Sequence, residues 1–186
     1  CFLHCFLVFL TVFLAAFFLL LVFLDGPVMK FLALVTFLVA SLTDYWDGRI
    51  ARETNQITSF GKLMDPIADK LLAPPAFLAF VQLGIIPAWM VVAIITRDLL
   101  VTGLRFLMTN DTDAQSARFS GKSKTALQFA FIVGVLIFLV AQELPYWKAD
   151  WTLPALQFIY VSMFFIVVLT LASGVWYVIK NREILS

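Results

Sequence analysis

The sequence predicts an all-α fold, a polytopic membrane protein in which a six-transmembrane-helix bundle surrounds a polar cavity that faces the cytoplasm. First, 62% of the 186 residues are hydrophobic and 13% are charged, whereas soluble domains hold about 45–50% apolar and about 25% charged residues. Second, the apolar runs are close to the ~20 residues that a helix needs to cross the hydrocarbon layer. Third, the polar residues gather between these runs. Six such helices use up the chain, so we expect a single domain over residues 1–186.

Each expected helix is bounded by turn residues or by a polar stretch. The first ends at the turn Asp-Gly-Pro at 25–27, and the third ends before Gly84. Residues 52–60 and 109–120 are rich in polar side chains and are predicted to be loops. The six expected helices are 2–24, 28–50, 61–83, 88–108, 122–142 and 153–179.

Basic residues gather on one side of the expected membrane. They flank the connection between the second and third helices, the connection between the fourth and fifth, and the C-terminal end: Arg49, Arg52, Lys62, Lys70, Arg105, Arg118, Lys122, Lys124, Lys180 and Arg182. The other connections hold only Lys30 and Lys148. Because cytoplasmic loops carry an excess of Lys and Arg, we expect these loops and both termini to face the cytoplasm.

Four aspartates lie in the stretch 41–72, between two apolar runs. Asp44 and Asp47 are three residues apart on the second helix, and Asp65 and Asp69 are four apart on the third, so each pair shares a helix face. Ionised carboxylates gathered in a bundle repel one another, and one or two hard divalent cations remove that conflict. Oxygen-only ligands favour magnesium, manganese or calcium over zinc or copper. The alternative is a solvated interfacial loop held by salt bridges.

Small residues and an arginine lie between the carboxylates. Gly48, Ala51 and Gly61 allow a backbone or a flat ligand to approach closely, as small residues do at helix contacts in membranes. Taken alone, Gly48 is equally consistent with a packing notch and Gly61 with a helix start. Arg52 offers a planar fork of donors that suits phosphate oxygens. A divalent-metal site beside this arginine indicates phosphate chemistry, in which paired metals contact the attacking and leaving oxygens.

Arg97 and Asp98 lie inside the fourth apolar run. An ionisable side chain there costs at least about 2.5–3.5 kcal/mol on insertion scales, and it is a functional hypothesis by default. The alternative is a structural ion pair, but adjacent residues on a helix do not face each other well. We therefore expect a functional role for Arg97, and we expect Asp98 to orient a neighbouring cation.

The spacing D-x2-D-G-x2-A-R-x8-G-x3-D-x3-D resembles the signature of the CDP-alcohol phosphotransferase family. The signature is complete here, as Asp44, Asp47, Gly48, Ala51, Arg52, Gly61, Asp65 and Asp69. Chain length and the six expected helices are also similar to that family, so the resemblance covers nearly the whole chain. The family's N-terminal amphipathic segment is not recognisable before Cys1, and we expect the chain to lack it.

Three further segments resemble the bacterial branch of the family that uses glycerol 3-phosphate as the acceptor: GKLMDPIADKLL (61–72), TRDLLVTGLR (96–105) and GKSKTALQ (121–128). The resemblance implies that glycerol 3-phosphate attacks the β-phosphorus of CDP-diacylglycerol and releases CMP. It also implies a homodimer in the bilayer, in the bacterial cytoplasmic (inner) membrane.

The resemblance also implies a role for each site residue. Two divalent cations, Mg2+ or Mn2+, would be held by Asp44, Asp47, Asp65 and Asp69, and Asp69 would also be the general base. CDP would be bound by Asp44, Gly48, Ala51, Arg52 and Gly61. The acceptor phosphate would be bound by Arg97, Arg105, Arg118, Lys122 and Lys124.

Other functions stay open at this point. A transferase of the same family could use serine, inositol phosphate or phosphatidylglycerol as the acceptor, although the basic residues favour a phosphorylated acceptor over serine. A divalent-cation transporter could also use carboxylates in a membrane. Transporters place such groups near the bilayer midplane, often within inverted repeats, whereas these aspartates lie at a helix end and the motif is not repeated.

Overall fold

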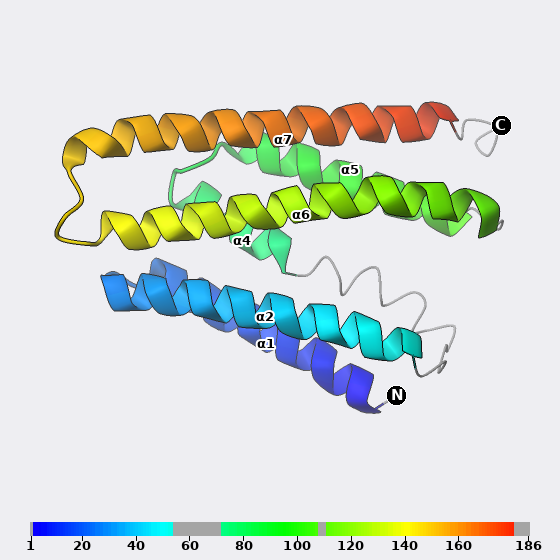
Figure 1. The fold of residues 1–186 in the computed structure, drawn as a ribbon, viewed down its shortest axis with the longest axis horizontal. Helices are drawn as coiled ribbons and strands as arrows, with labels where there is room; N and C mark the ends of the chain where they lie inside the picture. Colours follow the sequence, from blue (N-terminus) through cyan, green and yellow to red (C-terminus); the bar gives the residue numbers. More distant parts are fainter. Residues whose placement is uncertain (1, 54–71, 108–110, 181–186) are drawn as a thin grey trace. The chain divides into compact units, whose positions relative to one another are not determined.

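The computed structural model describes residues 2–53, 72–107 and 111–180, and every regular element within these ranges is helical (Figure 1). The all-α class predicted from the sequence is therefore confirmed for this part of the chain. The elements are α1 (Phe2–Phe23), α2 (Pro27–Glu53), α4 (Ala73–Gln82), α5 (Ala88–Leu107), α6 (Asp111–Gln142), the 3-10 turn η1 (Ala149–Trp151) and α7 (Thr152–Lys180).

Two predicted loop boundaries are wrong. The fifth helix begins at Asp111 and not at Lys122, so most of the predicted loop 109–120 is helical. That stretch is polar, but it contains neither glycine nor proline, and its Ala, Gln and Arg residues favour helix. In the same way, α2 continues through Glu53, past the predicted loop start at residue 52. Polarity alone marks where an apolar segment ends, and a helix can continue beyond that point.

The helices form two compact units. One comprises Cys1–Ala79 and Val133–Ala149, and the other comprises Phe80–Ile132 and Asp150–Ser186. The expected single domain over residues 1–186 stays a prediction.

In the first unit, α1 and α2 pack side by side (Figure 1). Their contact surface consists of buried residues at three- and four-residue intervals: Ala15, Phe18, Leu21 and Val22 on α1, and Ala33, Phe37 and Ala40 on α2. The rings of Phe18 and Phe37 are fully buried, with centroids 5.5 Å apart and planes inclined by 50°. This lies within the range of favourable aromatic pairs. Small alanines at neighbouring positions let the two helices approach closely enough for these rings to meet.

Lys30 closes the turn between α1 and α2. The last carbonyls of a helix have no partner within it, and here the buried Lys30 Nζ donates a hydrogen bond of 2.6 Å to the carbonyl oxygen of Val22. Gly26, with a φ of 111°, provides the left-handed turn that returns the chain. The cation also lies favourably at the negative end of the α1 dipole. Lys30 therefore has a structural role in this connection.

In the second unit, α5 and α7 lie side by side and run in the same direction (Figure 1). Trp89, near the start of α5, contacts Phe164 edge to face with ring centroids 6.4 Å apart. Further along both helices, Arg97 of α5 contacts Ser173 of α7. The buried apolar residues again follow helical spacing: Met90, Val91, Ile94 and Val101 on α5, and Ile159, Met163, Ile166, Val167 and Tyr177 on α7.

One helical segment in the described residues is long and apolar enough to cross a membrane, Ala149–Ile179, with 31 residues and a mean hydropathy of 2.3. Shorter apolar helical segments cover Leu10–Phe23, Pro27–Thr43, Ala73–Gln82 and Ala126–Gln142. The predicted set of six membrane spans stays a prediction.

The packing of α1 on α2 predicts a position-dependent cost of truncation. Phe37→Ala removes a fully buried ring and leaves a cavity, which in protein cores costs about 3–5 kcal/mol. Phe31→Ala is the matched control on the same helix, because the Phe31 side chain is 53% exposed. Thermal unfolding of the detergent-solubilised protein should show a clearly lower midpoint for Phe37→Ala. Equal midpoints for the two variants would contradict this packing.

Candidate active site

The first part of the predicted site lies on α2. Asp44 and Asp47 lie three positions apart on one continuous helix, so the helical spacing expected from the sequence is confirmed for this pair. Gly48, Ala51 and Arg52 follow in the last turns of the same helix. The two aspartates are therefore about 4.5 Å apart along the helix axis, at a rise of about 1.5 Å per residue. The remaining signature residues, Gly61, Asp65 and Asp69, lie outside the described residues.

The predicted metal site depends on the chemistry of its donor set. Four carboxylates without a thiolate or imidazole suit hard divalent cations such as Mg2+ or Mn2+. Among the described side chains, no three His, Cys, Asp or Glu residues gather at a position that could hold a metal ion. The side chains of the signature aspartates lie outside that described set, so the four-aspartate metal site stays a prediction. The chemistry of its carboxylate donors is consistent with it.

The predicted phosphate-binding cations lie on two helices. Arg97 and Arg105 are eight residues apart on α5, which is about 12 Å along the helix axis. Arg118, Lys122 and Lys124 lie on α6, where they were expected in or beside a loop. All five belong to the second compact unit. Their joint binding of one phosphate, and the cytoplasmic position of their helix ends, stay predictions.

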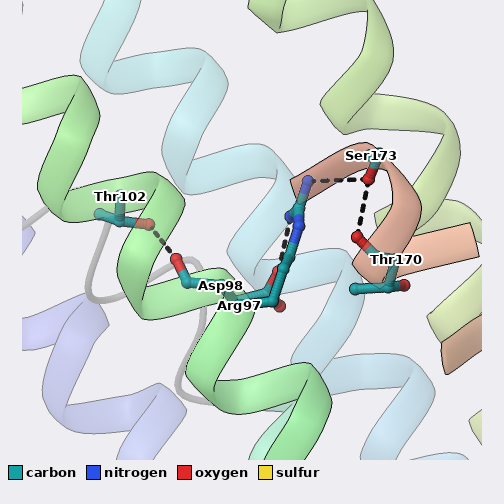
Figure 2. Close-up of polar contacts among 5 residues, drawn as sticks. All are labelled: Arg97, Asp98, Thr102, Thr170 and Ser173. Carbon is teal, nitrogen blue, oxygen red and sulfur yellow. Dashed lines mark hydrogen bonds and ion pairs between the residues drawn. The ribbon is translucent and has the colours of Figure 1, made fainter. Parts of the chain in front are cut away.

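Arg97 is held at three points in the contact between α5 and α7. Figure 2 shows two of them, Asp98 and Ser173. Its Nη1 donates to Asp98 Oδ1 at 2.8 Å, and its Nη2 donates to Ser173 Oγ at 3.3 Å. The Ser173 hydroxyl in turn donates to the carbonyl oxygen of Thr170 at 2.8 Å, so its lone pairs face the arginine. The third point is Gly174, whose missing side chain leaves room for the methylene groups of Arg97.

The ion pair between Arg97 and Asp98 corrects one sequence argument. Adjacent helix residues were expected to face each other poorly, yet the long arginine side chain bends back and reaches the neighbouring carboxylate. The expectation that Asp98 orients a neighbouring cation is confirmed by this contact. The side chains of Arg97 and Asp98 are 14% and 24% exposed. A functional role for Arg97 stays a prediction.

The guanidinium of Arg97 is only partly used by these contacts. A guanidinium has five N–H donors, and within the described part of the chain two of them are hydrogen bonded. The Nε–H is buried without a partner there. The described residues leave one N–H on each terminal nitrogen without a partner, and these are the groups with which an arginine fork binds carboxylate or phosphate oxygens. Arg97 thus retains donors for a ligand while Asp98 and Ser173 fix its orientation.

An apolar cavity of about 380 Å³ lies beside Arg97 and is open on one side. It is lined by Ala93, Thr96, Arg97, Leu100 and Val101 of α5 and by Leu171, Gly174, Val175, Val178 and Ile179 of α7. Its walls carry almost no polar surface, so the guanidinium head does not point into it. The cavity therefore does not suit an anion.

The chain belongs to the CDP-alcohol phosphatidyltransferase family, because it matches that family over residues 3–179. The family predicted from the signature is thus confirmed, and with it the prediction that the chain is a transferase enzyme. The prediction of a membrane protein agrees with a family that is membrane-associated.

Three relatives carry names that specify a reaction. The chain is 38% identical over 160 residues to the CDP-diacylglycerol–glycerol-3-phosphate 3-phosphatidyltransferase of Bacillus subtilis, covering 86% of this chain and 78% of the relative. It is 35% identical over 115 residues to the protein of the same name in Rickettsia bellii, covering 62% and 63%. It is 38% identical over 108 residues to the "Probable phosphatidylglycerophosphate synthase" of Mycobacterium tuberculosis, covering 58% and 51%. The chain therefore spans between about half and about four fifths of these relatives.

The sequence reasoning missed the residues of α7 that hold Arg97. Ser173 and Gly174 lie within a long apolar helix, where a Ser-Gly pair reads as a small-residue packing site. A signal was present: the pair is one of the few polar or small interruptions of α7. An ionisable residue in a neighbouring apolar helix needs such a partner, but the pairing of α5 with α7 is a tertiary contact that the sequence does not show.

The three-point hold of Arg97 predicts unequal costs for its partners. Asp98→Ala leaves a largely buried guanidinium without its counter-charge. Removing one partner of a fully buried ion pair costs about 3–5 kcal/mol of stability, and this figure is the upper limit for the present pair. Ser173→Ala removes one hydrogen bond, worth about 0.5–1.5 kcal/mol. The midpoint of thermal unfolding should be lower for Asp98→Ala than for Ser173→Ala. Asp150→Ala, at an exposed position in η1, is the control and should match the unaltered protein. A midpoint for Asp98→Ala equal to that control would contradict the hold.

Proposed function

We propose that this protein is an integral membrane enzyme of phospholipid synthesis that transfers the phosphatidyl group of CDP-diacylglycerol to glycerol 3-phosphate, giving phosphatidylglycerol phosphate and CMP. The observation that carries the proposal is the complete eight-residue signature in a chain that matches the family over residues 3–179. The name of the Bacillus subtilis relative, which aligns over 86% of this chain, supports glycerol 3-phosphate as the acceptor.

The transfer exchanges a phosphoanhydride bond of the donor for a phosphoester bond to the acceptor. A hydroxyl oxygen of glycerol 3-phosphate attacks the β-phosphorus of CDP-diacylglycerol. A new oxygen–phosphorus bond forms, and the bond between the β-phosphorus and the bridging oxygen breaks, so that CMP leaves with that oxygen. Asp69 accepts the proton of the attacking hydroxyl as general base, a role that requires hydrogen-bond reach to that hydroxyl.

The aspartates of the signature would hold the metal ions of this reaction: Asp44, Asp47, Asp65 and Asp69. Two divalent cations bound there would supply positive charge to neutralise the pyrophosphate and the leaving oxygen. Around them, CDP is bound where small residues allow close approach, with the arginine on a phosphate: Asp44, Gly48, Ala51, Arg52 and Gly61. The helical path of α2 through Glu53 supports this assignment, because it sets five of the signature residues on one continuous helix.

The acceptor carries a phosphate of its own, and this accounts for cations outside the signature. Arg97, Arg105, Arg118, Lys122 and Lys124 bind that phosphate in our proposal. Arginine suits the role because its fork gives two parallel hydrogen bonds to one phosphate. The terminal N–H groups of Arg97 that no described residue uses support its inclusion.

We also propose that the chain crosses the bacterial cytoplasmic (inner) membrane six times, with both termini and the active site facing the cytoplasm. The gathering of basic residues at the ends of α2, α5 and α7 supports this orientation. The lipid donor fits it too, since its acyl chains stay in the bilayer while its headgroup enters a site at the membrane surface. The family resemblance implies that the enzyme is a homodimer.

Replacing the proposed base separates proton transfer from binding. Asp69→Asn should lower transfer by about 10²–10⁴-fold, the range for loss of general-base catalysis. Metal-dependent binding of CDP-diacylglycerol should persist, because three carboxylates remain. CMP release in detergent micelles with Mg2+ or Mn2+ measures transfer, and retention of labelled CDP-diacylglycerol measures binding. Asp150→Asn is the matched control and should have normal turnover. Normal turnover in Asp69→Asn would exclude this residue as the base.

A panel of acceptors tests the proposed reaction itself. Purified protein with CDP-diacylglycerol and Mn2+ should release CMP with glycerol 3-phosphate and much less with serine, inositol phosphate or phosphatidylglycerol. Another acceptor as the best substrate would change the branch of the family but not the chemistry. Cation uptake into vesicles, with no CMP released from CDP-diacylglycerol in the presence of any acceptor, would favour a transporter.

Replacing Arg105 separates the two substrates. Arg105→Ala should raise the KM for glycerol 3-phosphate on the order of tenfold, because one charge-assisted contact to phosphate is worth about 1.5–3 kcal/mol. The KM for CDP-diacylglycerol should change less. Lys148→Ala, at an exposed position between α6 and α7, is the control. Equal effects of Arg105→Ala on both substrates would remove this residue from the acceptor site.

A further inference from the structure

We infer that Gly174 of α7 is a positioning residue, whose missing side chain makes the path that Arg97 follows from α5 to its hydrogen-bond partners. A Cβ atom built on Gly174 would lie 2.8 Å from Cγ of Arg97, 3.4 Å from its Nε and 3.7 Å from its Cδ. Atoms in ordinary contact do not approach to 2.8 Å, so any larger residue at position 174 displaces the arginine. For its effect on turnover, this inference rests on the proposed role of Arg97 at the acceptor phosphate.

Space and not backbone conformation explains the glycine at this position. Among the described glycines, positive φ angles occur at Gly26 and Gly84, whereas Gly174 has an ordinary helical backbone. Gly103 and Gly134 are also helical, and a Cβ at either would meet nothing within 4 Å in the described structure. Gly174 thus differs from Gly103 and Gly134 by its contact with one residue, Arg97.

The clash would fall on the middle of the arginine side chain. Cγ is close to the backbone of α5 and cannot move aside as the end of a flexible chain can. Its displacement therefore carries the guanidinium with it. Ser173, the preceding residue of α7, accepts the hydrogen bond from Nη2 at 3.3 Å, so two consecutive residues of α7 fix the middle and the end of Arg97 (Figure 2). Asp98 fixes the other terminal nitrogen.

The cavity beside Arg97 decides what a larger residue would do. Gly174 lines this apolar cavity of about 380 Å³ together with Thr96, Leu100 and Val175. The empty space can receive the displaced methylene groups, so Gly174→Ala should leave the helices packed. The guanidinium would lose its present alignment with Asp98 and Ser173. We therefore expect a misplaced cation in a folded protein, and a misplaced guanidinium loses the geometry of its charge-assisted hydrogen bonds to a bound phosphate.

The test is a double-mutant cycle between positions 174 and 97, measured as the KM for each substrate. Gly174→Ala should raise the KM for glycerol 3-phosphate on the order of tenfold and leave the KM for CDP-diacylglycerol and kcat nearly unchanged. Gly134→Ala is the matched control, since it replaces a helical glycine that has open space around it. Arg97→Ala should also raise the acceptor KM. Adding Gly174→Ala to Arg97→Ala should change it no further, because the residue that Gly174 positions is gone.

A second readout separates this inference from the proposed function. The thermal midpoint of Gly174→Ala should fall relative to Gly134→Ala, and the fall should disappear in the Arg97→Ala background. If this coupling is present while Arg97→Ala leaves the acceptor KM unchanged, Gly174 positions Arg97 but the acceptor role of Arg97 is wrong. If Arg97→Ala raises the acceptor KM and Gly174→Ala does not, the inference is overturned.

A variant that fails to fold also gives an answer. Should Gly174→Ala yield no folded protein, the double variant Arg97→Ala/Gly174→Ala shows whether a clash with Arg97 causes the loss of folding. Recovery of folded protein in the double variant supports a clash with Arg97. Loss of folding in both overturns the inference, since the glycine would then be needed for a reason other than the arginine.

Discussion

The second unit depends on how a guanidinium is held between two apolar helices. A charge in such a place must be paired and hydrogen bonded, because an isolated ion in a low-dielectric medium is costly. Arg97 meets this need with a carboxylate from its own helix and a hydroxyl from its neighbour. The hydroxyl comes from α7, so the contact also fixes the axial register of α7 against α5. The parallel register seen at Trp89 and Phe164 is the same register that brings Ser173 to Arg97.

In the first unit, a second cation finds its hydrogen-bond partner at a helix end. Lys30 is buried, and its ammonium group lies against a main-chain carbonyl of α1 rather than a carboxylate. The buried Lys30 and the partly buried Arg97 thus each connect two helices, Arg97 through a side-chain pair and Lys30 through the end of a helix dipole. Apolar packing between helices is not directional, whereas these polar contacts are. They select one register from the several that Phe, Leu and Ala surfaces would accept.

How much could be predicted from the sequence differs between the fold and the site. Apolar runs predict the helices well, and the end of α1 lies within one residue of its expected position, because hydropathy follows spanning length. The start of α6 was missed by eleven residues, since helix propensity continues where hydropathy stops. The position of Asp44 and Asp47 on one helix was predictable from their spacing, which is a local property. Ser173 and Gly174 were not, because their role exists only through the contact with Arg97.

The unexpected length of α6 has a mechanical consequence. Its 32 residues extend about 48 Å, longer than the ~30 Å hydrocarbon layer, and its apolar part begins only at Ala126. Arg118, Lys122 and Lys124 therefore stand on a stiff rod continuous with the apolar segment. Cations on a loop would lose conformational freedom whenever they closed on an anion. For cations on a continuous helix, the backbone has already lost this conformational freedom during folding. Their spacing along the helix is therefore set before any ligand binds.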